Sequence, residues 1–83
     1  MKLYRYFTEE EIEKYEIEDG KIYDEKSRIQ SFAYINEDYV LPDAFILDSF
    51  KIYEVDLFGE KYFPDEYISK IYANKLQILN EVN

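Results

Sequence analysis

The chain contains no cysteine and no histidine. Without cysteine it has no disulfide framework, no thiolate nucleophile and no cysteine-ligated zinc site, which agrees with a cytoplasmic location. Without histidine it lacks the side chain most often used as a general base and as a metal ligand. These two absences exclude most designs for nucleophilic catalysis and for tight metal binding.

Glycine and proline are scarce, with two of each. There is no run of about 18 apolar residues to span a bilayer, and residues 1–6 are charged and too short for a signal peptide, so we expect no contact with membrane. A chain of 83 residues has room for a single domain, residues 1–83. Its core is modest, because a chain of this size buries roughly 60 to 65 per cent of its unfolded surface. Ten tyrosines and six phenylalanines must fill much of that core.

Candidate catalytic groups are few. Serine and threonine have no histidine partner here, and no lysine stands out as buried and activated. Carboxylates are plentiful, but none lies in an Asp-x-Asp-x-Asp-Gly calcium loop. One interpretation of Glu37, Asp38 and Asp43 is a cation site. The other interpretation, which we favour, is a solvated turn. We expect a protein that is not an enzyme and has no cofactor and no metal.

The charge is strongly acidic, with 19 acidic against 10 basic residues and a net charge of −9. Most of it lies in two blocks, residues 8–25 and 37–66, each with nine carboxylates and two lysines. Such a chain is repelled by nucleic acid and by anionic membrane, and is attracted to basic protein surfaces. Acidity also keeps a tyrosine-rich protein soluble, and this simpler interpretation stays open.

Residues 50–58 are the longest stretch dense in β-branched and aromatic side chains. At period two, Tyr53, Val55 and Leu57 fall with Lys51 on one face, while the other face begins apolar and becomes acidic. This alternation predicts an antiparallel strand at the centre of a sheet. Gly59 and the residue after it suit a two-residue type II′ turn, so we expect residues 61–63 to fold back on residues 56–58.

The N-terminal third contains three local signals. Residues 2–7 alternate and predict a strand. Thr8 and Glu11 form a capping-box pattern, followed by apolar residues at helical spacing, so a helix of about two turns should begin at Thr8. Asp19 and Gly20, with an isoleucine on either side, predict a small hairpin or a tight turn.

The middle and the end of the chain are less distinct. We expect a strand at residues 29–35, a turn at 36–38 and a short strand at 39–41. Pro42 suits the first position of a short helix. Residues 75–82 fit either a helical face or a strand face, and periodicity does not decide between them.

A resemblance bears on this last segment. Glu-Val-Asp at residues 54–56, Gly-Glu at 59–60 and the stretch Ser-Lys-Ile-Tyr-Ala-Asn-Lys-Leu-Gln-Ile-Leu-Asn-Glu-Val at 69–82 resemble the end of a family of small phage and prophage domains of unknown function. The resemblance implies a short helix near 65–73, a final strand near 75–82 and an origin in a mobile element. It identifies no functional residue.

These patterns together predict an α+β fold, with a small antiparallel sheet of about four to six short strands and two or three short helices. The acidity favours a non-enzymatic, phage-type binding protein that inhibits a host nucleic-acid-binding protein by occupying its basic surface, as anti-CRISPR and anti-restriction proteins do. Direct binding to nucleic acid is not expected. The alternatives are an immunity protein that neutralises a toxin, and an accessory protein-binding domain.

The residues expected to contact the partner form two groups. In the first group, Glu9, Glu13 and Glu16 have spacings of four and three, which place them in one row on a helix. The second group comprises Asp43, Asp48, Glu54 and Asp56. Strand and turn geometry places these carboxylates less regularly than a helix would.

Overall fold

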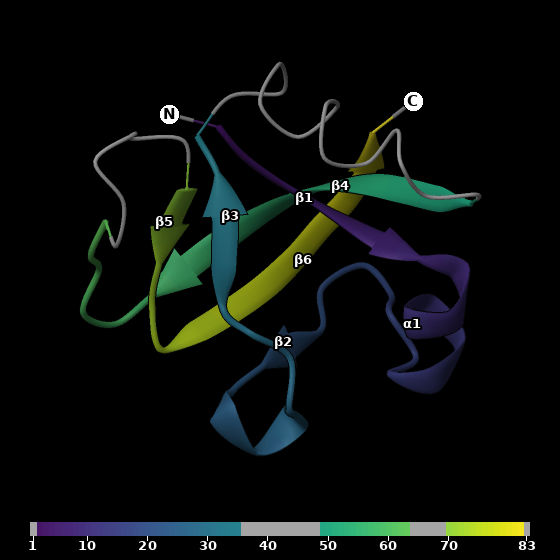
Figure 1. The fold of residues 1–83 in the computed structure, drawn as a ribbon, viewed down its shortest axis with the longest axis horizontal. Helices are drawn as coiled ribbons and strands as arrows, with labels where there is room; N and C mark the ends of the chain where they lie inside the picture. Colours follow the sequence, from purple (N-terminus) through teal and green to yellow (C-terminus); the bar gives the residue numbers. More distant parts are fainter. Residues whose placement is uncertain (1, 36–48, 64–69, 83) are drawn as a thin grey trace.

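The computed structural model describes residues 2–35, 49–63 and 70–82, which build one six-stranded antiparallel sheet with strand order β2-β6-β4-β1-β3-β5 (Figure 1). The α-helix α1 lies at the opposite side of the molecule from β5 (Figure 1). The elements in chain order are β1 (Leu3–Thr8), α1 (Glu9–Lys14), β2 (Ile22–Tyr23), the 3₁₀ turn η1 (Glu25–Ser27), β3 (Phe32–Tyr34), β4 (Phe50–Phe58), β5 (Lys70–Tyr72) and β6 (Lys75–Val82).

The predicted α+β class with two or three helices is wrong. The described residues contain one α-helix of six residues and a single 3₁₀ turn, so the fold is predominantly antiparallel β. The helix expected near 65–73 is contradicted where it is described, because Lys70–Tyr72 is strand β5 and pairs with β3. The Tyr72 ring packs against that of Phe32 with 5.3 Å between centroids, a cross-strand contact that local periodicity does not reveal.

The prediction for residues 50–58 is confirmed. Strand β4 spans that segment and pairs with β1 on one side and β6 on the other. Tyr53, Val55 and Leu57 point into the core, with 5%, 2% and 1% of their surfaces exposed. Both edges of β4 are hydrogen-bonded, so it is the strand on which the others assemble.

One face of the sheet carries the core. The buried side chains there come from β1, β3, β4, β6 and the segment between α1 and β3. Ile12 and Tyr15 pack against them from α1 and its end. The buried apolar residues of this cluster are Phe7, Ile17, Tyr23, Ile29, Ala33, Tyr53, Val55, Leu57, Leu76 and Ile78.

The helix begins as predicted. Thr8 is the N-cap of α1: its hydroxyl accepts a hydrogen bond from Glu11 N at 3.1 Å, and the Glu11 carboxylate accepts one from Thr8 N at 3.0 Å. The helix ends after Lys14, and Glu16 adopts a positive φ of 52°. The six residues of α1 make about 1.7 turns, close to the two turns predicted.

The hairpin predicted after β4 is wrong. Phe58 pairs with Lys75 of β6, and Tyr62 forms an isolated bridge with Tyr72 of β5. Gly59 has a φ of +95°, and Glu60 N donates to the Asn74 side-chain oxygen at 2.8 Å. The glycine thus starts a turn that leads the chain away from β4.

The remaining predictions have mixed outcomes. The strands expected at 2–7 and 75–82 correspond to β1 and β6, whereas only 32–34 of the expected strand at 29–35 is β. Gly20 lies in a tight turn in which Lys21 N donates to Glu18 O at 3.3 Å, but β2 then pairs with β6 and no local hairpin forms. Three expected elements lie outside the described residues: the turn at 36–38, the short strand at 39–41 and the helix that begins at Pro42.

The two glycines provide a matched pair for a test of backbone strain. Both have φ near +90°, but a Cβ at Gly20 would meet open space, whereas one at Gly59 would lie 2.9 Å from Asn74 Cβ. We expect Gly20→Ala to lower the free energy of unfolding by about 1 kcal/mol, the penalty for a left-handed residue. Gly59→Ala should cost about 2 to 4 kcal/mol, because it also displaces the amide that binds Glu60 N. If urea unfolding gave the same loss of stability for both variants, this account of the turn at Gly59 would be wrong.

Tyr23 connects β2 to the end of α1. Its hydroxyl donates to the carbonyls of Tyr15 at 3.2 Å and Glu16 at 3.0 Å. Burial, with the nearby charges of Glu18 and Glu16, raises the pKa of Tyr23 to about 12 from its usual 10.0. Because the folded-state pKa is the higher one, the corresponding stability is complete below pH 10 and is lost as the pH rises through 12.

Tyr23→Phe should therefore lower the free energy of unfolding at pH 7 by about 1 to 2 kcal/mol through loss of these hydrogen bonds. It should also make the fall in stability between pH 10 and 12 shallower than in the wild type. Denaturant unfolding at pH 7 and between pH 10 and 12 measures both differences. Tyr62→Phe, at an exposed ring, is the control and should change the stability at pH 7 by less than about 0.5 kcal/mol. If the free energy of unfolding of Tyr23→Phe fell as steeply between pH 10 and 12 as that of the wild type, groups other than Tyr23 would account for the alkaline loss of stability.

Candidate functional site

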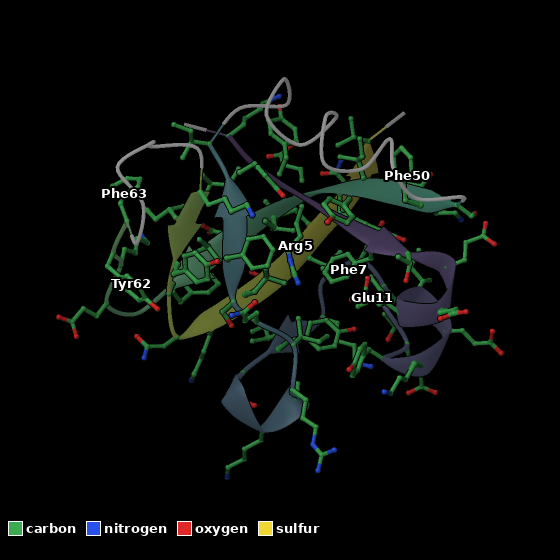
Figure 2. The ribbon with its side chains drawn as sticks, in the orientation of Figure 1. Arg5, Phe7, Glu11, Phe50, Tyr62 and Phe63 are labelled. Carbon is green, nitrogen blue, oxygen red and sulfur yellow. The ribbon has the colours of Figure 1, made fainter. Side chains whose placement is uncertain are left out.

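Carboxylates gather around α1 and the turn that follows it. Residues 9–20 contain seven carboxylates and one lysine. Six of the carboxylate side chains are exposed, and red-tipped side chains project outward from α1 in Figure 2. We call this set the α1 acidic surface; it comprises Glu9, Glu10, Glu13, Glu16, Glu18 and Asp19.

The predicted helical row of carboxylates is shorter than expected. Glu9 and Glu13 lie one turn apart on α1, and both are exposed. Glu16 lies beyond the end of the helix, where its positive φ turns the chain. Its carboxylate forms a 3.8 Å ion pair with Lys21, with 85% of the Glu16 side chain exposed. Glu16 therefore belongs to the same surface but not to the same helical row.

The described members of the second predicted group, Glu54 and Asp56, lie apart from the first group. Glu54 and Asp56 alternate along β4 with buried residues, so they lie on the sheet face opposite the core, whereas α1 packs against the core face. Asp56 is exposed and accepts a hydrogen bond from Leu57 N at 2.9 Å. Asp43 and Asp48 lie outside the described residues.

Within residues 2–35, 49–63 and 70–82, no three carboxylates gather closely enough to hold an ion. The proposed cation ligands Glu37, Asp38 and Asp43 lie outside those ranges. The Ser31 hydroxyl donates to the Asn74 carbonyl at 3.3 Å, so its proton is not directed at a base.

A polar hollow of about 310 Å³ lies beside Ser31. Its walls include the stacked rings of Tyr62 and Tyr72, together with Arg28, whose φ is +63°. A second hollow adjoins Tyr62 and Asn74 on the Glu60 side. These features make a grooved surface at the end of the molecule away from α1.

Sequence reasoning missed Arg5. Its side chain is only 6% exposed, and its guanidinium carbon lies 4.1 Å from the centre of the Phe32 ring and 4.6 Å from that of Phe7. Figure 2 places Arg5 in the middle of the molecule beside Phe7, with Glu11 on the α1 side. The available signal was the alternation of Leu3, Arg5 and Phe7, which puts the arginine between two core residues.

Burial lowers the pKa of Arg5 to about 10 from 12.5, and the carboxylate of Glu11 partly offsets this. Arg5 is therefore still a cation at neutral pH, held in an environment that disfavours its charge.

Aromatic rings continue from Phe32 to the edge of the sheet. Tyr6 contacts Tyr34 at 6.2 Å, Tyr34 contacts Phe32 at 6.0 Å, and Tyr72 connects Phe32 to Tyr62 at 5.3 and 5.5 Å between centroids. The row crosses from β1 through β3 and β5 and ends at the exposed Tyr62 ring. Such ring pairs stabilise the sheet edge beyond their buried area.

None of the helices in the described part of the chain has the length and apolar character that crossing a bilayer requires. The resemblance of residues 54–82 to phage domains stays a prediction. Comparison with protein-family models, with curated proteins and with solved structures finds no match to this chain.

Proposed function

We propose that this chain is a non-enzymatic binding protein that inhibits a host nucleic-acid-binding protein, of the restriction or CRISPR type, by docking its α1 acidic surface on that protein's basic surface. The observation that carries the proposal is the concentration of six exposed carboxylates on one short helix and turn. A surface of this kind presents negative charge where the target would otherwise bind phosphate groups.

Hydrogen bonds hold the backbone of this acidic surface in place. Lys21 Nζ donates to the carbonyls of Tyr15 and Glu16, as does the Tyr23 hydroxyl. At the following turn, Gly20 N donates to Ile78 O at 2.7 Å, which connects the turn to β6. A preorganised surface loses less conformational entropy on binding, so these contacts favour a docking role.

The same surface would also serve an immunity protein that neutralises a basic toxin. Affinity capture from the native host at moderate salt, followed by mass spectrometry, identifies the partner. A captured nucleic-acid-binding protein that DNA or RNA displaces supports inhibition of a host nuclease. Capture of a toxin supports the immunity role. Binding that is insensitive to salt and to nucleic acid contradicts both.

Reversal of two helix charges tests the surface directly. Glu9→Lys with Glu13→Lys should slow association with the captured partner steeply at low salt, because such charges act mainly on the association rate. The fold should persist. Loss of the Glu9 carboxylate from the first turn of α1 costs about 0.3 to 1 kcal/mol, and Glu13 lies near the C-terminal end of the helix, where the dipole favours a cation. Surface plasmon resonance at several salt concentrations measures the rate, and circular dichroism checks the fold.

The matched control is Glu60→Lys with Glu81→Lys, which changes the net charge equally at two exposed carboxylates outside both predicted groups. It should retain most of the wild-type association rate. If both double variants slowed association equally, net charge alone would account for binding, and the α1 acidic surface would lose its role.

A further inference from the structure

Arg28 has a backbone conformation that is costly for its side chain. It follows the 3₁₀ turn η1 and has a φ of +63°, in the left-handed region that glycine and asparagine adopt more easily. The other described non-glycine residue with a positive φ is Glu16, whose carboxylate pairs with Lys21. The exposed Arg28 guanidinium forms no hydrogen bond or ion pair within residues 2–35, 49–63 and 70–82. The turn therefore requires a left-handed residue but does not explain an arginine.

The Arg28 side chain lines an open hollow of about 310 Å³. Tyr62 and Tyr72 form another part of its wall, with ring centroids 5.5 Å apart and ring planes 21° from parallel. Tyr62 is 56% exposed, so its ring has free surface on which a further planar group can stack. Figure 2 shows Tyr62 at the end of the molecule away from α1. The hollow thus combines a free cation with an aromatic stack.

Two exposed side-chain amides complete the wall, those of Gln30 and Asn74. Asn74 Oδ1 accepts a hydrogen bond from Glu60 N at 2.8 Å, which fixes this amide and leaves its NH₂ group as a donor. The Gln30 amide forms no hydrogen bond with another described residue, so it offers both a donor and an acceptor. Donors and acceptors of this kind pair with the edge of an unstacked nucleotide base.

We propose that this hollow binds a mononucleotide whose base stacks on Tyr62 and whose phosphate pairs with Arg28. The amides of Gln30 and Asn74 face the edge of the base. Guanidinium binds phosphate oxygens through two parallel hydrogen bonds, and an arginine without an internal partner is available to do so. Stacking on an aromatic ring tolerates every base, so the ring determines the class of ligand rather than the base.

The size and the charge of the protein favour a single nucleotide over a longer chain. The hollow is at the lower end of the range for small-molecule sites, about 300 to 1,000 Å³. A net charge of −9 repels a polyanion strongly, whereas a mononucleotide carries one phosphate group. The site is separate from the α1 acidic surface and does not depend on the function proposed for that surface.

Nuclear magnetic resonance titration of the full ¹⁵N-labelled chain tests the site. The probes are AMP and UMP, each compared with its nucleoside and with inorganic phosphate at an ionic strength held constant with sodium chloride. The Arg28 Nε–H signal and the backbone amide signal of Tyr62 report binding. At least one of the two nucleotides should bind about tenfold more tightly than its nucleoside or phosphate, because one molecule engages both halves of the site. If neither nucleotide bound more tightly than its fragments, the proposal would be overturned.

Arg28→Gly separates binding from folding. It should weaken nucleotide binding about tenfold through loss of the charged hydrogen bonds. Its urea midpoint should not fall, because relief of the left-handed strain offsets the entropic cost of glycine. The control is Lys2→Gly, which removes the same charge at an exposed residue outside the wall of this hollow and should change the affinity less than twofold. Equal weakening in both variants, or wild-type affinity in Arg28→Gly, contradicts the pairing of phosphate with Arg28.

Tyr62 variants test the stack. Tyr62→Phe keeps an aromatic ring and should bind within twofold of the wild type, whereas Tyr62→Leu should bind about tenfold more weakly. The ring current of a stacked side chain should move the base proton signals of the nucleotide upfield with the wild type and Tyr62→Phe, but not with Tyr62→Leu. If the leucine variant matched the phenylalanine variant in affinity and in these shifts, the base would not stack on Tyr62 and the proposal would be wrong.

Discussion

Hydrogen bonding on both edges of β4 is the constraint on which the rest of the structure depends. A chain of 83 residues has little core to distribute, and β4 brings three buried side chains to its centre while it pairs with β1 and β6. The register with β1 places Arg5 opposite Tyr53 and Phe7 opposite Lys51. The depth of Arg5, the entry into α1 and the position of the last strand all follow from this pairing.

Aromatic side chains do the packing that a small core otherwise lacks. Phe7 meets Tyr53 edge to face at 5.9 Å inside the core, while the row from Tyr6 to Tyr62 covers the β3 and β5 end of the sheet. Large rings bury much area for few residues, which suits short strands such as β3 and β5. Two of them, Phe7 and Phe32, also contact the Arg5 guanidinium, so packing and charge are coupled at that point.

Exposed and buried charges lie in different parts of the molecule. Exposed carboxylates lie around α1, whereas Arg5 and Lys70 contact rings of the aromatic row. The exposed carboxylates around α1 and the buried Arg5 are therefore distinct features of one small domain. Salt screens the exposed carboxylates and screens the buried guanidinium much less.

Local signals in the sequence determined local structure. The Thr8 to Glu11 capping box, the alternation along residues 50–58 and the glycine turns at 20 and 59 each depend on neighbours within a few residues, and each is found where the pattern predicted an element or a turn. The α1 acidic surface was predictable in part for the same reason, because Glu9 and Glu13 share a helix turn.

Only the tertiary structure decided which strands meet. Residues 61–63 could pair locally with β4, but β6 occupies that edge and Tyr62 pairs with β5 instead. Residues 70–72 are strand because β3 offers them an edge and the Phe32 ring. Arg5 is buried against the rings of Phe7 and Phe32, which come from different strands. Glu16 leaves the helical row because the chain turns back to β6, where Gly20 N donates to Ile78 O. These outcomes rest on contacts between residues distant in sequence, which no short pattern encodes.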